Sequence, residues 1–264
     1  MSGDVRFTRQ QRPLITLLTD FGTADGYVGE IKGALLCAVP RAELIDISHD
    51  IPANDVESGR LAVSRYWQRF PEGTVHLVVV DPGVGGARVA LAVSSAGRSL
   101  VGPDNGVLSP ALLVPGAMAV ALPVGGHAAA TFHGRDVFAP AAAALVRGVA
   151  LSELGPVYDT PICRRTPEPE RRADGTVEGQ VIAIDRFGNA ITNCVGTPGD
   201  TIEANGQVVV IARIYADVTP GSIVAVTGSN GLVEIAERDG NAARRLGLER
   251  GSVVLLRHAQ AAGR

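Results

Sequence analysis

Alternation between apolar runs and helix-like segments constrains the fold of this chain more than any other feature of its sequence. Residues 14–20 and 74–80 form short, mostly apolar runs and residues 43–48 a third strand-like run, while residues 26–40 and 54–70 between them have the pattern of helices. Strands that are apolar along their whole length are buried on both faces, which is typical of a parallel sheet covered by helices. The sequence therefore predicts an N-terminal α/β domain with a mostly parallel sheet and helices on both faces.

Further elements of this domain can be placed in the same way. Residues 89–95 and 98–102 have the character of strands, and the alanine-rich residues 139–150 have the character of a helix. Asn54 is a suitable N-cap for the helix over 54–70, because Glu57 follows three residues later as in a capping box.

The character of the sequence changes after about residue 155. Residues 161–171 are rich in proline and charge, which is typical of a linker. Beyond the linker, short strand-like runs alternate with glycine turns, as in a small β-barrel; they cover residues 176–193, 207–215, 221–228, 231–237 and 251–258. We therefore predict an α/β domain over residues 1–160 and a smaller C-terminal β-barrel domain over residues 172–264.

Composition excludes several classes of protein. The net charge is −3 at pH 7 and aromatic residues make up 4% of the chain, so the basic surplus and stacking residues of nucleic-acid binders are missing. No apolar run reaches the roughly 18 residues that suggest a membrane span. The polar residues 1–13 lack the apolar segment of a signal peptide, and Cys37, Cys163 and Cys194 form neither a metal motif nor a disulfide framework. We expect a cytoplasmic protein that binds neither nucleic acid nor membranes.

Acidic loops follow the three apolar runs of the N-terminal domain. Asp20 and Asp25 follow the first run, Asp50 follows the second, and Asp81 follows the third. The carboxyl ends of parallel strands meet at one edge of a sheet, where ligands bind, although an aspartate at a strand end can also simply form an Asx-turn. Paired carboxylates suit a ribose diol, an ammonium group or a divalent metal ion.

The segment 81-DPGVGGAR-88 separates one aspartate from one arginine by three glycines and a proline. An ordinary turn needs one or two glycines, so this loop has more backbone freedom than a turn requires. We expect the loop to fold back so that Asp81 and Arg88 meet, with the glycines allowing close approach to a ligand.

Two further segments carry candidate functional residues. In 131-TFHGRDVFAP-140, His133 and Asp136 flank a Gly-Arg pair, and His133 could be a base, a hydrogen-bond partner or a core residue. In 185-DRFGNAITN-193, Gly188 indicates a tight turn that presents Asn189 beside Phe187. An aromatic ring next to an amide suits an adenine base, and an ordinary hairpin turn is the alternative.

Several common catalytic motifs are absent from the sequence. It contains neither GxGxxG nor GxxxxGK[ST], so neither a dinucleotide site nor a P-loop is supported. It also lacks HExxH, clustered Cys/His pairs and GxSxG, which argues against zinc catalysis and serine hydrolases. We therefore predict no metal site and no cofactor.

Six motifs, taken in order, resemble those of one family. They are TDFG-x-x-D-x-Y-V-G, DPGVG-x-x-R, GPDNG, TFHGRD-x-FAP, D-x-FGN-x-x-TN and G-S-x-G-x-x-E-I-A, and the similarity around them spans roughly residues 14–258. This set is similar to that of the SAM hydroxide adenosyltransferases, or S-adenosyl-L-methionine (SAM) hydrolases, which are related to the fluorinase and chlorinase enzymes.

The resemblance implies a reaction and an assembly. The expected reaction is hydrolysis of SAM to adenosine and L-methionine, by in-line attack of water or hydroxide at the ribose C5′. The expected assembly is a homotrimer in which SAM binds between the N-domain of one subunit and the C-domain of its neighbour.

The resemblance also assigns residues by motif. The catalytic set falls on Asp81, Arg88 and His133, with Asp81 and Arg88 binding the attacking water. Asp20 is expected at the ribose hydroxyls and Asp25 near the methionine portion. The remaining substrate-binding positions belong to the C-domain: Phe187, Asn189 and Tyr215 near adenine, Ser229, Glu234 and Asp185 near methionine, and Glu237, whose backbone matters more than its side chain.

Departures from the halogenase branch favour water as the nucleophile. Where that branch has a tyrosine after the third strand, this chain has Asp81, and where it has hydroxyl side chains, this chain has Val84 and Gly134. A desolvated halide needs hydrogen-bond donors, and the negative charge of Asp81 would repel it.

Two other functions remain open on the sequence alone. One is a metal-dependent phosphohydrolase that uses Asp20, Asp25, Asp50 and Asp81 as ligands. The other is a non-catalytic protein that binds SAM or a nucleoside. The sequence does not decide which sulfonium epimer of SAM is preferred, nor whether Asp81 or His133 takes the proton from water.

Overall fold

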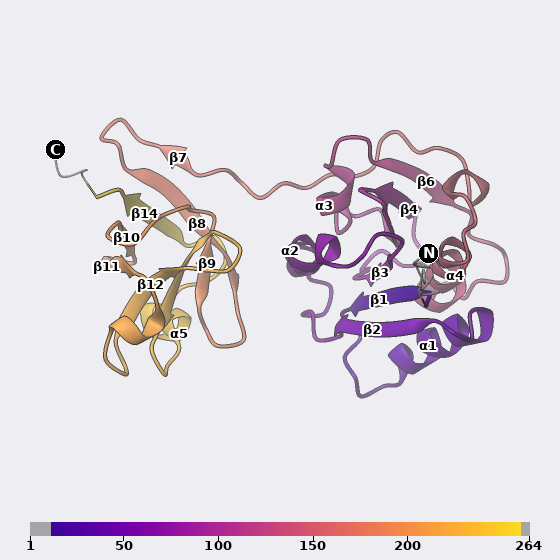
Figure 1. The fold of residues 1–264 in the computed structure, drawn as a ribbon, viewed down its shortest axis with the longest axis horizontal. Coiled ribbons are helices and arrows are strands. Elements are labelled where there is room, and N and C mark those ends of the chain that lie inside the picture. The colour runs from indigo at the N-terminus through magenta and orange to yellow at the C-terminus, as the bar shows by residue number, and fades with distance from the viewer. Residues whose placement is uncertain (1–11, 260–264) are drawn as a thin grey trace, which may run out of the picture. The chain divides into compact units, whose positions relative to one another are not determined.

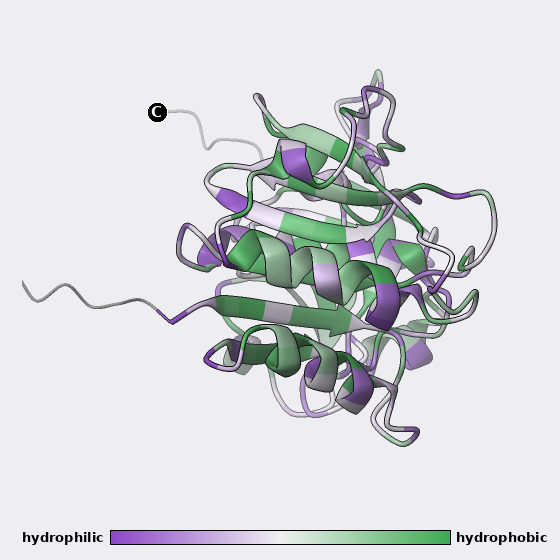
Figure 2. Ribbon diagram, turned by 90° about the vertical axis from the view of Figure 1, so that its right-hand side faces the viewer, coloured by the Kyte–Doolittle hydropathy of each residue, from purple (hydrophilic) through white to green (hydrophobic). Residues whose placement is uncertain are grey.

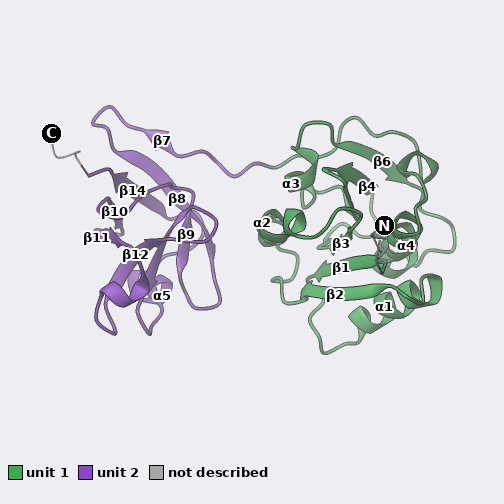
Figure 3. Cartoon of the chain, in the orientation of Figure 1, with its two compact units in different colours: residues 1–164 green, residues 165–264 purple. Residues whose placement is uncertain are grey.

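The computed structural model describes residues 12–259 and divides into two compact units between residues 164 and 165 (Figure 1 and Figure 3). Residues 1–11, which include most of the polar segment considered for a signal peptide, lie outside the described part. Each unit has its own hydrophobic core and is described by itself.

Unit 1 contains one six-stranded sheet with strand order β2-β1-β3-β5-β4-β6. Neighbouring strands among β2, β1, β3 and β5 pair in parallel, and β4 runs antiparallel to both β5 and β6. The sheet is thus mostly parallel, as the apolar runs predict. The strands are β1 (Leu14–Thr19), β2 (Glu43–Ser48), β3 (Val75–Val79), β4 (Ala90–Ser95), β5 (Arg98–Pro103) and β6 (Met118–Leu122).

Helices cover both faces of this sheet. One core lies beneath α1 (Tyr27–Ala38) and α4 (Ala139–Val146), and a second lies beneath α2 (Val56–Tyr66) and α3 (Ser109–Leu112). Alternate residues of β3 enter the two cores: Leu77 packs in the first and Val78 in the second. Hydrophobic residues are concentrated along the strands (Figure 2), which explains why these strands show no polar alternation.

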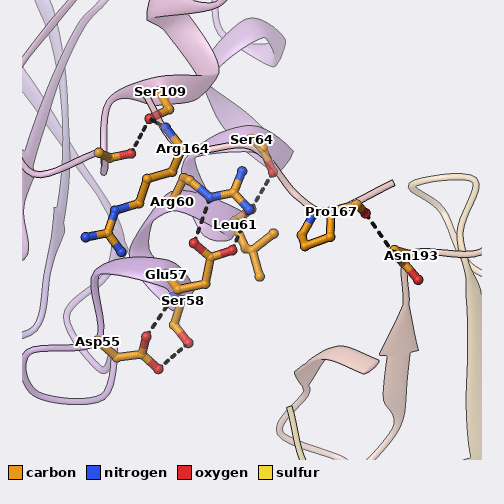
Figure 4. A network of polar contacts seen from close by, with 11 residues as sticks. Asp55, Glu57, Ser58, Arg60, Leu61, Ser64, Ser109, Arg164, Pro167 and Asn193 are labelled. Carbon is orange, nitrogen blue, oxygen red and sulfur yellow. Dashed lines mark hydrogen bonds and ion pairs between the residues drawn. The ribbon is translucent and has the colours of Figure 1, made fainter. Parts of the chain in front are cut away.

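The N-terminus of α2 differs from the prediction in its capping residue. Asp55, not Asn54, is the N-cap, and its side chain accepts a hydrogen bond of 3.0 Å from the Ser58 backbone N–H (Figure 4). Asn54 lies one residue earlier in the left-handed region, with φ of 66°. Glu57 pairs with Arg60 in the first turn of the helix instead of closing a capping box with Asn54.

Unit 2 is a closed seven-stranded β-barrel with one short additional strand. Its strand order is β14-β10-β11-β12-β13-β9-β8-β7, and pairing of β14 with β8 closes the barrel and leaves β7 outside it. The strands are β7 (Glu170–Arg171), β8 (Val177–Ile184), β9 (Ala190–Thr192), β10 (Thr201–Ala204), β11 (Gln207–Ala212), β12 (Ile223–Thr227), β13 (Val233–Glu237) and β14 (Val253–Arg257), and the short helix α5 (Ala242–Leu246) completes the unit. The predicted fold class, an α/β domain followed by a β-barrel, is confirmed.

Between residues 12 and 259, none of the helices combines the length and hydrophobicity that a membrane crossing demands. The longest, α1, has 12 residues, which is short of the roughly 20 needed.

A buried histidine makes the stability of unit 1 dependent on pH. His76 on β3 is fully buried, and its Nδ1 lies 2.7 Å from Thr16 Oγ1 on β1. The rings of Tyr66, Trp67 and Phe70 meet its ring edge-on. Burial lowers the pKa of His76 from 6.5 to about 4, and the positive charge of Arg98 acts in the same direction.

We therefore predict that unit 1 loses stability as the pH falls from about 6.5 to about 4. In this range the unfolded chain binds a proton at residue 76 that the folded chain excludes, so the loss is roughly 3 kcal/mol in total. Trp67, the only tryptophan of the chain, reports unfolding by fluorescence in urea at each pH.

The matched comparison is His76→Gln against His127→Gln, because His127 is an exposed histidine of the same unit. His76→Gln should reduce the difference in stability between pH 7 and pH 4.5 by about 2 kcal/mol, and His127→Gln should leave it unchanged. An unaltered pH dependence in His76→Gln would contradict the assignment.

Candidate active site

Asp81 and Arg88 meet at the carboxyl end of β3. Arg88 Nε donates to both carboxylate oxygens of Asp81, at 2.9 Å and 3.0 Å, and Arg88 Nη2 donates to Asp81 Oδ2. The side chains are only 4% and 10% exposed for Asp81 and Arg88 respectively. A forked guanidinium facing a carboxylate fixes the orientation of both groups. The contact that the sequence predicted between these two residues is therefore present.

His133 joins this pair from the segment before α4. Its Nδ1 lies 2.8 Å from Arg88 Nη2, and the residue is 4% exposed. It immediately precedes a π-helical turn, Gly134–Phe138, which leads into α4. Irregular turns of this kind occur often at functional sites because they re-aim side chains that a regular helix would direct elsewhere.

The contact with Arg88 fixes the protonation of His133. A guanidinium is always a donor, so Nδ1 must accept, and the ring is neutral with its proton on Nε2. Burial lowers the pKa of His133, and the positive charge of Arg88 lowers it further. Near neutral pH His133 is therefore an uncharged group that orients the arginine.

One nitrogen of Arg88 remains available to a ligand. Nε and Nη2 serve Asp81 and His133, while Nη1 is buried and has no hydrogen-bond partner among the described residues. The guanidinium carbon also lies 5.2 Å from the centre of the Phe138 ring, which supports one face of the group. A buried donor without an acceptor is costly, so Nη1 is suited to an oxygen atom of a bound molecule.

The glycines of the 81–88 loop have separate structural roles. Gly85 has φ of 75°, and a Cβ at this position would lie 2.3 Å from the carbonyl oxygen of Ala130. A Cβ on Gly83 would lie 3.2 Å from Cγ of Arg88, so a side chain there would crowd the arginine. Gly86 donates its N–H to the Gly83 carbonyl at 3.0 Å and closes the turn. The loop thus needs its glycines to pass under the segment before His133 and to admit Arg88.

Asp20 lies near this group at the end of β1. Its Oδ2 accepts a 2.8 Å hydrogen bond from the backbone N–H of Asn54. Burial raises the pKa of Asp20, and the negative charge of Asp81 raises it slightly more, which places the two carboxylates in the same electrostatic environment. Asp25 lies in the same loop, but its side chain is exposed.

The carboxylates do not form a metal-binding cluster. Among residues 12–259, no three His, Cys, Asp or Glu side chains are grouped as metal ligands are. Asp50 is exposed, and its backbone N–H bonds to the Ser48 hydroxyl in a local turn. The phosphohydrolase alternative therefore gains no support from the geometry of Asp20, Asp25, Asp50 and Asp81.

In unit 2, the predicted adenine-binding turn is built around Asp185. Its Oδ1 accepts hydrogen bonds of 2.9 Å from the backbone N–H groups of Phe187 and Asn189, and its Oδ2 accepts one of 2.9 Å from Asn189 Nδ2. Gly188 has φ of 83°, as a tight turn of this kind requires. The Phe187 ring is 73% exposed. Asp185 thus shapes the turn, and Phe187 presents an aromatic face.

The structure also shows the surroundings of the other residues of unit 2 that were predicted to bind substrate. Tyr215 donates its hydroxyl to Glu234, and burial together with this carboxylate raises the pKa of Tyr215. Ser229 is exposed in the loop before β13. Glu237 binds Arg245 at 2.7 Å and the backbone N–H of Asn241 at 3.0 Å, so its carboxylate serves the structure of the barrel.

Comparison with known proteins identifies the family. Residues 15–155 match the model of the SAM hydroxide adenosyltransferase N-terminal domain, and residues 179–255 match that of its C-terminal domain. The chain belongs to the SAM hydroxide adenosyltransferase family.

Individual relatives agree with this assignment. A protein of Thermus thermophilus named (R)-S-adenosyl-L-methionine hydrolase is 41% identical over 256 residues, covering 92% of this chain and 98% of the relative. A fluorinase of Nocardia brasiliensis is 31% identical over 217 residues, covering 70% and 72%. The crystal structure of an uncharacterized conserved protein from Thermotoga maritima has a TM-score of 0.83 at 30% identity, covering 92% of this chain and 99% of that one.

Asn105 supports the site and was missed by the sequence analysis. Its Nδ2 donates to the carbonyl of Val80 at 2.8 Å, directly before Asp81. The adjacent Asp104 accepts the backbone N–H of Ile162 at 2.7 Å. The motif GPDNG was noticed, but sequence spacing alone could not show that β5 lies beside β3 and brings Asn105 to Val80.

Ser109 helps hold the same end of unit 1. Its Oγ accepts the backbone N–H of Arg164 at 2.8 Å (Figure 4) and donates to the carbonyl of Gly106 at 2.6 Å. Together with the bond from Ile162 to Asp104, this contact fixes residues 162–164 against the loop that carries Asn105.

We predict that Gly85→Ala destabilises unit 1 by about 1–3 kcal/mol, because it combines a positive φ with a clash against the Ala130 carbonyl. Urea unfolding followed by Trp67 fluorescence measures the change. Gly86→Ala is the matched control, since its Cβ would approach the Gly83 oxygen only to 3.2 Å. Equal stability of the two variants would show that the close approach at Gly85 is not required.

Proposed function

We infer that the protein hydrolyses S-adenosyl-L-methionine to adenosine and L-methionine by attack of water at the ribose C5′. Its family membership, and the hydrolase name of a relative that is 41% identical along nearly the whole chain, support the reaction. The observation that carries the mechanism is the buried Asp81–Arg88–His133 group with one free guanidinium nitrogen.

Asp81 is the proposed proton acceptor. In the reaction the water oxygen forms a bond to C5′, the C5′–S bond breaks with its electron pair going to sulfur, and the attacking water loses a proton. His133 is poorly placed to take that proton, because its Nδ1 faces Arg88 and its Nε2 is already protonated. Each carboxylate oxygen has two lone pairs, so Asp81 can bind Arg88 and still accept a proton from water.

The charges of the site also suit this reaction. The sulfonium loses its positive charge as the attacking water gains one, so positive charge moves from sulfur toward the oxygen. A fixed carboxylate beside that oxygen stabilises the transition state more than the ground state. Arg88 Nη1 would hold the water by donating to its lone pair, leaving the second lone pair directed at C5′. Free water has a pKa of about 15.7, so proton loss during attack is easier than prior formation of hydroxide.

Water is favoured over halide by the shape of the site as well as by its charge. A Cβ on Gly134 would lie 3.0 Å from Cδ1 of Ile31 and 3.5 Å from the rings of Phe21 and Phe132. A hydroxyl side chain at this position therefore has little room without movement of Ile31. The fluorinases are also more distant relatives of this chain than the hydrolases are.

The finer features of the protein are proposed from the family resemblance. We propose a homotrimer with SAM bound by Asp20 and Asp25 of one subunit and by the unit 2 residues of its neighbour. No cofactor is proposed, and the cytoplasm is the proposed location. The substrate includes the (R) sulfonium epimer, because the Thermus thermophilus relative is named for it.

The deciding experiment is incubation of the protein with resolved (R)- and (S)-SAM in oxygen-18 water, followed by chromatography and mass spectrometry. We expect adenosine carrying one oxygen-18 atom, with the (R) epimer consumed faster. Added EDTA should not change the rate, and added fluoride or chloride should give no halogenated adenosine. Methylthioadenosine as the product, or adenosine without the label, would contradict the reaction.

Asp81→Ala should lower kcat by at least 100-fold while SAM still binds.

We predict that kcat/KM falls on the acid side with an apparent pKa below 6.5. Protonation of His133 places a second positive group against Arg88, and the lowered pKa of His133 moves this event below 6.5. In His133→Asn the amide oxygen can still accept from Arg88 but cannot titrate. The decline should then shift to lower pH, and an unchanged profile would remove His133 from the explanation.

A further inference from the structure

Four polar side chains from four segments of unit 1 form a continuous line beside the Asp20 loop. Lys32 of α1 binds Asp46 of β2, with 2.6 Å between Nζ and Oδ2. Asp46 Oδ1 lies 3.0 Å from Nε2 of His49, an ion-pair distance without good hydrogen-bond geometry. His49 Nδ1 in turn lies 2.8 Å from Oγ1 of Thr19, the last residue of β1. His49 and Thr19 are both buried, so the inner half of this line is shielded from water.

His49 holds the chain on both sides of Asp20. Before Asp20, its ring bonds to the Thr19 hydroxyl, which also accepts the backbone N–H of Phe21 at 3.3 Å. After Asp20, the backbone carbonyl of His49 accepts the N–H of Gly22 at 2.8 Å. Residue 20 is therefore fixed within a segment of four residues that a single histidine ties at two points.

The segment that begins at His49 also supplies the partner of the Asp20 carboxylate. Asn54 donates its N–H to Asp20 Oδ2, and its φ of 66° is unusual for a residue with a side chain. The backbone at Asn54 thus adopts a disfavoured conformation at a point where it meets Asp20. The segments 19–22 and 49–54 together fix the direction of the Asp20 carboxylate.

We propose that His49 is a positioning residue that orients Asp20 for the two hydroxyl groups of the ribose. This proposal rests on the proposed function, in which Asp20 accepts hydrogen bonds from the ribose diol. The sequence analysis gave no role to His49 and placed Asp50 beside it in a possible metal site. In the structure Asp50 is exposed, whereas His49 is buried and bonded to Thr19, directly before Asp20.

The size of the effect follows from geometry. A carboxylate that faces two vicinal hydroxyls must hold both oxygens in place, and small displacements of a positioning group cost large factors in recognition. Without the bond to His49, the buried Thr19 hydroxyl keeps only its bond from the Phe21 N–H, and the start of the loop loses a fixed point. In a variant that lacks the His49–Thr19 bond, we expect the affinity for adenosine, which carries both hydroxyls, to fall about tenfold. The affinity for 2′,3′-dideoxyadenosine, which carries neither hydroxyl, should change by less than twofold.

The chain offers a matched control for the central variant. Thr19→Val removes the hydroxyl that bonds to His49 and hardly changes the volume of the side chain. Thr16→Val does the same three residues earlier on β1, where the fully buried Thr16 bonds to His76 at 2.7 Å. Both variants break a buried Thr–His pair, but only Thr19 adjoins Asp20. Thr19→Ser keeps the hydroxyl and should restore the wild-type behaviour.

The test measures binding of adenosine and 2′,3′-dideoxyadenosine by calorimetry, and KM and kcat for SAM, in the full-length protein. Thr19→Val and His49→Gln should reduce the ratio of the two affinities about tenfold, while Thr16→Val leaves this ratio unchanged at a similar cost in stability. In an Asp20→Ala background, Thr19→Val should have no further effect on the ratio.

Two results would overturn the proposal. One is an affinity ratio of adenosine to 2′,3′-dideoxyadenosine that is unchanged in Thr19→Val and His49→Gln. The other is an equal reduction of this ratio in Thr16→Val. Either result means that His49 serves stability alone. If Thr19→Val does not fold, the comparison of His49→Gln with Thr19→Ser decides in the same way. Failure of the proposed function is distinguishable, because the wild-type protein would then release no adenosine from SAM.

Discussion

The guanidinium of Arg88 is the interaction on which the arrangement of the site depends. It is buried, and it faces a carboxylate on one side, a neutral imidazole on another and an aromatic ring on its face. A buried arginine needs a counter-ion and acceptors for most of its donors, because an unpaired buried charge is expensive, and Nη1 is the donor left for a bound molecule. Arg88 therefore accounts for its surroundings. Asp81 is its counter-ion, His133 is an acceptor for it, and the loop glycines leave room for its side chain.

The same group also bears on whether water or a halide suits the site of this chain. An anionic halide has to be surrounded by donors, and a carboxylate at residue 81 opposes it electrostatically. Water is neutral and needs both a donor and an acceptor, which Arg88 Nη1 and Asp81 provide side by side. The packing of Ile31 near Gly134 closes the space in which a hydroxyl side chain would otherwise stand. The charge of Asp81 and the limited space beside Gly134 therefore each favour water over a halide.

Sequence patterns predicted those features that depend on local or regular constraints. The strands β1 and β3 are buried along almost their whole length, so they and the acidic loops that follow them were placed correctly, as was the meeting of Asp81 with Arg88. The strand β6 was missed because Met118–Leu122 lies among glycine and proline residues without a clear period. The cap of α2 was wrong by one residue, since the local pattern fits Asn54 well and only the tertiary bond to Asp20 shows why Asn54 stays outside the helix. His49 and Asn105 could not be given roles because the contacts that define those roles, with Thr19 and Val80, join residues 25 or more positions apart in the chain.

Asn54 illustrates how the site outweighs local preference. Asparagine is among the best N-cap residues, yet here it adopts a positive φ and leaves the cap to Asp55. The left-handed conformation has a cost, which asparagine bears better than most residues with a side chain. That cost is offset where its N–H meets the carboxylate of Asp20, whose pKa is raised by burial and by the nearby Asp81. The Asn54 N–H acts against this effect, because a hydrogen bond to the carboxylate favours the ionised form of Asp20, the form that accepts hydrogen bonds from hydroxyl groups. The strained backbone at Asn54 thus helps to hold the Asp20 carboxylate in one orientation.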